Sequence, residues 1–275
     1  MALYGILGDI HGNREALEAA IACLEARGID RIACVGDLVG YNADGDACVE
    51  LLRSRGAVSI AGNHDLIGTG KLGFERCSNK AMHSLKRTRR TLAPATAAYL
   101  RELPSHHRLE PGVLLTHGGV RDVQQYMTKS RHVIENVSYL RNDFPGARIC
   151  FYGHTHEQRV FEVGAEGAGG VAVAEPFAAA LAGDGPRWVR LDPSKEYFIN
   201  PGSVDAARKR SAKLAEYAIF DGAALMVEFG RVAYDEAASE AKANAAGFRI
   251  DRWRDRLYDV QRRFIGPRHR EQENA

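Results

Sequence analysis

The chain has 275 residues, 45% of them hydrophobic and 26% charged, which is enough to bury a sizeable core in one or two domains. Its formal net charge of +2 gives no overall attraction to nucleic acid or to a membrane, so any such contact must be local. No apolar run approaches the roughly 20 residues that cross a bilayer, and the chain opens on a strand and a motif, so we expect a cytoplasmic protein with no cleaved signal and no membrane partner.

An apolar strand at Leu3 to Leu7 runs directly into Gly8-Asp9-Ile10-His11-Gly12. The flanking glycines let the chain leave the strand at Asp9, so that a carboxylate and an imidazole enter one small space. Such a pair is a possible beginning of a metal site, although a plain polar turn is the commoner explanation of so short a motif.

The same junction of strand, glycine and polar residue recurs twice before residue 66. A second strand at Arg31 to Val35 ends at Gly36-Asp37, and a third at Ala57 to Ala61 ends at Gly62-Asn63-His64-Asp65, with amphipathic helices between the strands. Strand-helix-strand units of this length predict a parallel sheet, whose ligands gather beyond the carboxyl ends of its strands. The three junctions are therefore expected at one edge of the sheet.

Two later strands also end in histidines. The buried strand Val113 to Thr116 is followed by His117, and the strand Ala147 to Tyr152 is followed by Gly153-His154-Thr155-His156. Two histidines two residues apart are only suggestive of a metal site by themselves. Five such junctions in chain order are more than plain polar turns would explain, so together they indicate a metal site.

The pattern divides the chain into a main domain at residues 1–235 and a helical extension with a tail at 236–275. Residues 66–110 predict a helical insertion, and residues 164–186 read as a loop rich in glycine and alanine. The extension holds eight arginines between Arg249 and Arg270, together with aromatic residues at helical spacing. Packing of these aromatic side chains on the body is favoured over a contact with nucleic acid.

The polar residues at the strand ends share oxygen or nitrogen donors and include no cysteine. They are Asp9, His11, Asp37, Asn63, His64, His117, His154 and His156. Such donors suit divalent manganese, iron, zinc, nickel or cobalt and argue against an iron–sulfur site. The neutral carbonyl of an asparagine ligand fits a second ion, because it keeps the net charge of the site low.

In these motifs the sequence resembles the calcineurin-like metallophosphoesterase superfamily, whose pattern of D-x-H, G-D, G-N-H-D/E, H and G-H-x-H stands here in order. The resemblance covers roughly residues 3–203 and includes the N-P-G-S of a compact bacterial phosphodiesterase branch at Asn200 to Ser203. It implies an α/β (α+β) fold, in which a β-sandwich of two mixed sheets is flanked by helices as four αββα layers.

The resemblance also implies a dinuclear metal site with manganese as the expected ion. Two ions about 3.5–4 Å apart would lower the pKa of a shared water, and the metal-bridging hydroxide would attack phosphorus. His64 would be the catalytic residue that protonates the leaving oxygen or stabilises the phosphoryl charge. In this assignment Asp9, His11 and His156 bind the first ion, Asn63, His117 and His154 bind the second, and Asp37 bridges them.

The residues directly after Asp37 narrow the choice of substrate. Ser/Thr protein phosphatases of the superfamily continue as G-D-x-V-D-R-G, whereas this chain continues as Leu38-Val39-Gly40-Tyr41 and lacks the phosphate-gripping arginine. We therefore expect a hydrolase of a phosphodiester or small phosphate ester, with a dinucleoside polyphosphate hydrolase or a nuclease as alternatives. A protein phosphatase or a non-catalytic scaffold is less favoured.

Three further residues keep open alternatives. Arg208 and Lys213 would either bring positive charge to the substrate or lie on a solvated surface. Asp65 would either orient a neighbour or only begin a helix. The sequence leaves the native metal, the substrate and the oligomeric state open.

Overall fold

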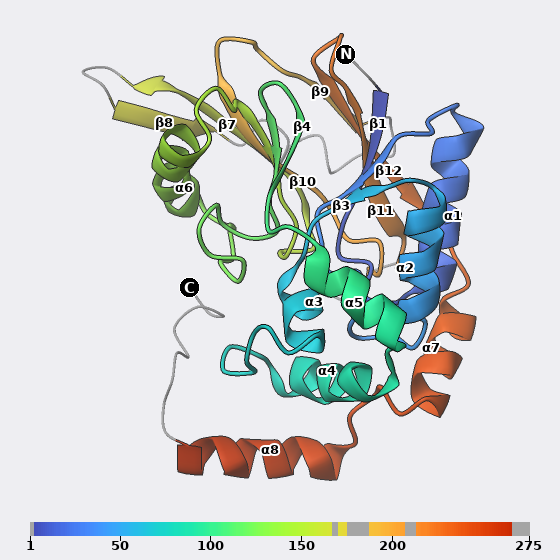
Figure 1. Ribbon diagram of the computed structural model, residues 1–275. Helices are drawn as coiled ribbons and strands as arrows, with labels where there is room; N and C mark the ends of the chain where they lie inside the picture. Colours follow the sequence, from blue (N-terminus) through green and yellow to red (C-terminus); the bar gives the residue numbers. More distant parts are fainter. Residues whose placement is uncertain (1–2, 167–169, 175–186, 207–212, 266–275) are drawn as a thin grey trace.

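The computed structural model describes residues 3–166, 170–174, 187–206 and 213–265 (Figure 1). Within these residues the strands form two six-stranded mixed sheets. The first sheet contains, in spatial order, β3 (Val58–Ser59), β2 (Ile32–Cys34), β1 (Leu3–Leu7), β11 (Ala215–Asp221), β12 (Met226–Val232) and β9 (Arg187–Arg190). The second contains β4 (His107–Glu110), β5 (Val113–Leu115), β6 (Ile149–Phe151), β10 (Glu196–Pro201), β7 (Gln158–Glu166) and β8 (Gly170–Ala174).

Each sheet has three neighbouring parallel strands. In the first sheet β1 pairs in parallel with β2, and β2 with β3. In the second sheet β6 pairs in parallel with both β5 and β10. Because the carboxyl ends of parallel strands meet at one edge, each trio brings the loops at its carboxyl end together.

The core lies between the two sheets and on their outer faces. Along β1, Tyr4 and Ile6 are buried against residues of the second sheet such as Phe151, whereas Leu7 is buried among residues of the helical side. This alternation is the period of two that a strand with both faces covered requires.

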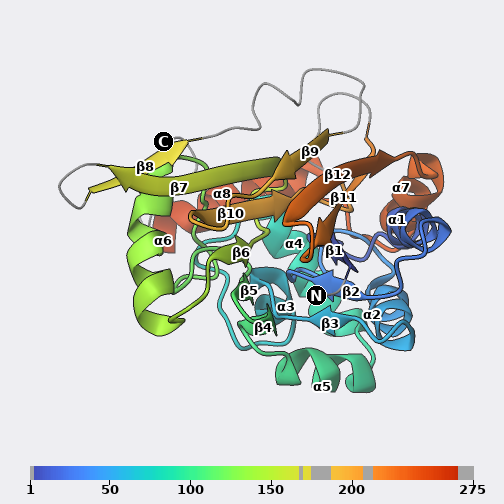
Figure 2. The same ribbon diagram turned by 90° about the horizontal axis from the view of Figure 1, so that it is seen from above.

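Helices cover both outer faces of the paired sheets (Figure 2). On the first sheet lie α1 (Arg14–Ala26) and α2 (Gly45–Ser54), with α7 (Glu236–Ala245) packed against α1, and on the second lies α6 (Ser130–Asp143). The remaining helices are α3 (Asn63–Gly68), α4 (Asn79–Thr91), α5 (Pro94–Glu102) and α8 (Arg252–Ile265). The predicted four-layer αββα fold is therefore confirmed.

Two expectations from the sequence are wrong in detail. The expected helical insertion at residues 66–110 ends in a strand, β4, whose polar side chains are exposed or half-buried at the sheet edge and so carry no apolar pattern. The expected loop at 164–186 is in part a hairpin, because residues 164–166 complete β7 and pair antiparallel with β8. Residues 167–169 and 175–186 lie outside the described residues.

The helical extension contacts the body through both of its helices, and Lys242 of α7 forms an ion pair with Glu15 of α1. The Lys86 ammonium of α4 lies 4.6 Å from the centre of the Tyr258 ring, as packing on the body predicts. Trp253, in contrast, is 61% exposed, so the expectation is wrong for this residue. The boundary at residue 235 stays a prediction. None of the helices in the described segments combines the length and the apolar character that a bilayer crossing needs.

Candidate metal centre

The loops after the parallel strands have an unusual backbone. Five of the candidate ligands have a positive φ, a region that residues other than glycine rarely adopt and that is concentrated at functional sites. These residues are Asp9 (51°), His11 (52°), Asp37 (56°), His154 (67°) and His156 (60°). The sharp departure from each strand turns the side chains toward one another, as the glycine-flanked motifs predict.

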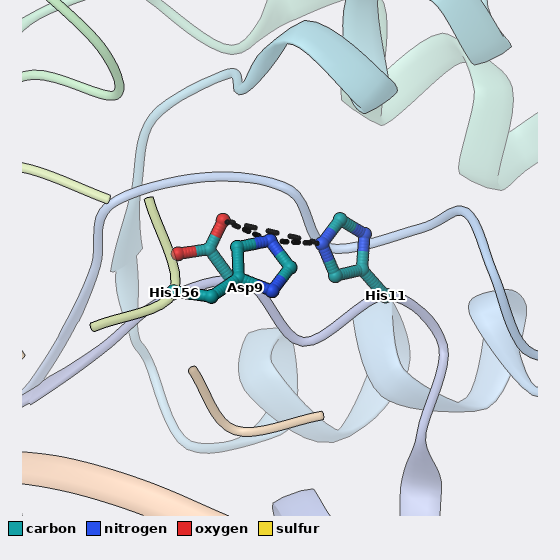
Figure 3. A group of neighbouring side chains, drawn as sticks. All are labelled: Asp9, His11 and His156. Atoms are coloured by element: carbon teal, nitrogen blue, oxygen red, sulfur yellow. Dashed lines mark hydrogen bonds and ion pairs between the residues drawn. The ribbon is translucent and has the colours of Figure 1, made fainter. Parts of the chain in front are cut away.

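One group of donors forms where the first and last motifs meet (Figure 3). The Nε2 atoms of His11 and His156 lie 3.1 Å apart. Asp9 Oδ1 lies 3.4 Å from His156 Nε2 and 4.0 Å from His11 Nε2. All three side chains are buried, although they lie far apart in the sequence.

A second group of donors forms around Asp37. Its Oδ2 atom lies 3.2 Å from Nε2 of His117, and that same nitrogen lies 3.0 Å from Oδ1 of Asn63. His154 completes the group, with a ligand atom within 4.8 Å of those of Asp37 and His117. Asp37 Oδ2 is also 3.7 Å from His11 Nε2, so this carboxylate lies between the two groups.

The hydrogen bonds of the histidines show that these donors fit a cation. His117 Nδ1 lies 2.7 Å from the carbonyl oxygen of Val35, and His11 Nδ1 lies 3.3 Å from that of Val39. A carbonyl oxygen only accepts, so each Nδ1 donates, and in a neutral ring Nε2 then carries a lone pair. Lone pairs of nitrogen and oxygen thus converge, which is the arrangement of a divalent metal site.

The electrostatics lead to the same conclusion. Burial opposes a charged imidazole, yet the adjacent Asp37 carboxylate raises the pKa of His117 to about 9. Burial also opposes ionisation of Asp37, but the imidazoles of His117 and His64 hold the pKa of this carboxyl well below its usual range. The site therefore favours positive charge beside Asp37, supplied by a proton or by a metal ion.

Backbone amides fix the carboxylates. The His154 N–H donates to Asp9 Oδ1 and Oδ2 at 3.1 and 3.0 Å, and the His64 N–H donates to Asp37 Oδ1 at 2.7 Å. These bonds hold each carboxylate from a loop other than its own. They restrict the rotation of Asp9 and Asp37 and leave Asp37 Oδ2 directed at the histidines.

Asp65 links the second and third motifs. Its Oδ1 accepts from the N–H groups of Leu38 and Val39 at 2.9 and 3.1 Å, and its Oδ2 accepts from Gly62 at 2.9 Å. As the third residue of α3, Asp65 therefore both caps the start of that helix and orients the loop of Asp37, so the two alternatives left by the sequence hold together. Burial, reinforced by the charge of Asp37, raises the pKa of Asp65 to about 7.

His64 is buried beside the first donor group. Its ring centre lies 4.5 Å from that of His11, and its ligand nitrogen belongs to a cluster with His11 and Asp37. Arg208, the candidate for binding the substrate, lies outside the described residues. Its companion in the sequence, Lys213, forms an ion pair with Glu236 of α7.

Two tyrosines at the site were not singled out by sequence reasoning. The Tyr41 ring lies 4.7 Å from the His11 ring and 4.8 Å from the His64 ring, and the Tyr126 ring lies 4.1 Å from that of His154. No motif in the sequence points to Tyr126. Tyr41 could have been found, because it stands four residues after Asp37 in the second motif.

The N-P-G-S turn supports the loops of the first and last motifs. Ser203 Oγ donates to the carbonyl oxygen of Asp9 at 3.0 Å. Asn200 Nδ2 donates to the carbonyl oxygen of Gly153 and to Thr155 Oγ1, both at 2.9 Å. The turn therefore has a structural role behind the donors, and its motif in the sequence is the signal that points to it.

A paired-sheet fold with a histidine- and carboxylate-rich cluster at the strand ends defines a protein of the metallophosphoesterase type. Residues 2–224 match the calcineurin-like phosphoesterase superfamily domain, and the chain belongs to that family. The family expected from the motifs is thus confirmed. The members of this family are metal-dependent phosphoesterases. Membership therefore supports the expectation that the protein hydrolyses phosphate esters.

Relatives match over most of their own length. The chain is 30% identical over 239 residues to the uncharacterized protein MJ0912 of Methanocaldococcus jannaschii, covering 85% of this chain and 88% of that one. A metallophosphoesterase of Sphaerobacter thermophilus has a similar structure, with 29% identity, a TM-score of 0.72 and coverage of 92% and 96%. The hypothetical protein PH1004 of Pyrococcus horikoshii is similar in fold, with 17% identity, a TM-score of 0.63 and coverage of 94% and 97%.

Proposed function

We propose that the protein hydrolyses a phosphodiester, or another small phosphate ester, with two divalent metal ions. The observation that carries this proposal is the place of Asp37 between two donor groups, with Oδ2 at 3.2 Å from His117 Nε2 and 3.7 Å from His11 Nε2. A carboxylate shared in this way is what two neighbouring ions need. The family of the chain supports the same class of reaction.

The donors divide between the two ions by their distances. Asp9, His11 and His156 would hold one ion, and Asn63, His117 and His154 the other, with Asp37 shared. Manganese is the expected metal, and iron, zinc, nickel or cobalt suit the same donors. When bound, two such ions polarise a phosphoryl oxygen and lower the pKa of a water that attacks phosphorus.

We assign His64 the role of a catalytic residue rather than of a ligand. Its N–H is held by Asp37 Oδ1 at 2.7 Å, and its ring packs edge-on against the His11 ring. The residue is only 4% exposed, so its ring is shielded from solvent. His64 would donate that proton to the leaving oxygen or stabilise charge on the phosphoryl group.

The segment after Asp37 supports a phosphodiester over a phosphoprotein as substrate. In the places where a protein phosphatase carries the aspartate and the arginine for phosphate, this chain carries Gly40 and Tyr41. Neither residue is charged, and the Tyr41 ring lies against the rings of His11 and His64. A small phosphate ester is also proposed in preference to nucleic acid.

The test is a substrate screen on the purified protein after loading with manganese. The panel contains an aryl phosphodiester, cyclic nucleotides, diadenosine polyphosphates, phosphomonoesters and single-stranded RNA, and bound metal is counted by mass spectrometry. We expect two ions per chain and hydrolysis of a phosphodiester. Two bound ions without turnover of any ester would refute the proposal, and preferred cleavage of RNA would replace the substrate class.

A further inference from the structure

The segment beyond the family domain reaches back to the metal centre. Arg249 lies between α7 and α8, outside the matched residues 2–224. Its Nη1 donates to the carbonyl oxygen of Tyr41 at 2.8 Å, and its Nη2 donates to Asn42 Oδ1 at 2.9 Å. One side chain from the end of the chain thus binds two consecutive residues of the loop after Asp37.

Glu240 of α7 holds the Arg249 guanidinium in place. Nε of Arg249 lies 3.0 Å from both carboxylate oxygens, and Nη2 lies 2.5 Å from Oε2. The two side chains are 34% and 44% exposed, and an ion pair so exposed contributes little stability by itself. The pair instead orients the planar guanidinium so that its other donors meet the Tyr41 loop.

Arg249 also connects to a buried polar network behind the site. Asn42 Nδ2 donates to Asp205 Oδ1 at 2.6 Å, and Asn13 Nδ2 donates to the same oxygen at 2.8 Å. The N–H of Asp205 donates to the carbonyl oxygen of Asp9 at 3.1 Å. Asn13, Asn42 and Asp205 are at most 4% exposed, so their polar groups depend on one another for partners.

The contacts of Arg249 reach the candidate metal centre through the Tyr41 ring. It lies 4.7 Å from the ring of His11 and 4.8 Å from that of His64. The peptide group that follows Tyr41 is held at both of its polar atoms, because the Asn42 N–H donates to the His11 carbonyl oxygen at 2.9 Å and Arg249 Nη1 donates to the Tyr41 carbonyl oxygen. Arg249 therefore helps to fix the backbone from which the Tyr41 ring packs against both imidazoles.

We propose that Arg249 is a positioning residue, which holds Tyr41 against His11 and His64 and thereby sets the orientation of the His64 imidazole. The catalytic consequence rests on the proposed function. The extension at residues 236–265 is then part of the working site, although it lies outside the matched family domain. Arg249 acts through Tyr41 and does not itself touch the substrate.

The first test is a double-mutant cycle of Arg249→Ala and Tyr41→Ala, assayed on the aryl phosphodiester. Each single change is expected to lower kcat about tenfold, with KM and bound metal within about twofold of the parent. The double variant should be no slower than Tyr41→Ala, because both changes remove the same interaction. Additive losses would overturn the proposal. Arg249→Lys, which keeps one donor to the Tyr41 carbonyl, should recover part of the loss.

Arg27→Ala is the matched control. Arg27 forms a bidentate pair with Glu228 at 2.5 and 2.8 Å, and its side chain is similarly half-exposed. It lies just beyond the carboxyl end of α1, whereas the metal-centre loop precedes the amino end of that helix. Its loss should leave kcat within about twofold of the parent. An equal loss of kcat in both variants would show a general effect of stability and overturn the proposal.

A readout without turnover separates this inference from the proposed function. In protein labelled with ¹⁵N-histidine, the Tyr41 ring current shifts the imidazole signals of His11 and His64. Arg249→Ala should move the same two signals as Tyr41→Ala and leave unchanged that of His107, which lies on β4 at an edge of the second sheet. Unmoved His11 and His64 signals would overturn the positioning role whatever the activity. Inactivity of the parent on every ester would instead refute the proposed function.

Discussion

Asp37 Oδ2 lies 3.2 Å from His117 Nε2, and both side chains are buried. This contact joins the end of β2 in one sheet to the end of β5 in the other. The donors of the candidate metal centre therefore come together only when the two sheets are packed together. Its geometry is a consequence of the sandwich and of no single motif.

The first prediction concerns Asp37→Asn. The amide keeps the size of the side chain but removes the negative charge that both donor groups share. We expect the variant to retain neither ion after dialysis, as measured by metal mass spectrometry. Asn13→Ala, which alters the buried network behind the site without removing a donor, should keep both ions. Full occupancy in Asp37→Asn would contradict the shared role.

The second prediction is a pH dependence of metal binding. Burial would lower the pKa of His117, but the Asp37 carboxylate raises it to about 9, so in the metal-free protein this imidazole stays protonated at neutral pH. A metal ion must displace that proton. Affinity for manganese should therefore rise with pH, by about tenfold per unit for one displaced proton, until pH approaches 9. Titration calorimetry at pH 7.0 and 8.0 measures it, and equal dissociation constants would count against the assignment.

The sequence predicts the donors because each of them comes after an apolar run and stands beside or near a glycine. His154 and His156 illustrate how far local pattern reaches: their strand, their turn and their chemistry are all visible within about ten residues. Their partners are not. That His156 meets His11 across the sandwich is implied by the resemblance to a family and by no spacing in the chain.

Arg249 and Asp65 show where sequence reasoning ends. Arg249 binds Tyr41 across 208 positions, and nothing near either residue marks the contact. Asp65 reads as an ordinary helix start, because the amides of Leu38 and Val39 that it also binds come from another loop. Exposed strands such as β4 are missed for a different reason, since their side chains face water and have no apolar period to detect.

The third prediction separates catalysis from metal binding at His64. Replacement by Gln keeps a polar side chain of similar length but removes the titrating imidazole. Turnover of the aryl phosphodiester should fall by about two to three orders of magnitude, the usual contribution of a proton donor. Both ions should stay bound, because the other donors are unchanged. Parental turnover in a variant that retains its metal would show that His64 has another role.

The fourth prediction uses a glycine that packs against His64, the proposed catalytic residue. A Cβ at Gly40 would overlap His64 Nδ1 and approach His11 Nδ1 to 3.0 Å, and the φ of 141° is strained for any other residue. Gly40→Ala should therefore displace the two imidazoles, lower turnover at least about tenfold and weaken manganese binding. Gly28→Ala is the control, since its φ of 68° is also positive but nothing lies within 4 Å of the added carbon. Each change should lower the free energy of unfolding by about 1 kcal/mol through backbone strain. Only Gly40→Ala should affect the site, and equal kinetics in the two variants would show that the overlap is relieved without moving His64.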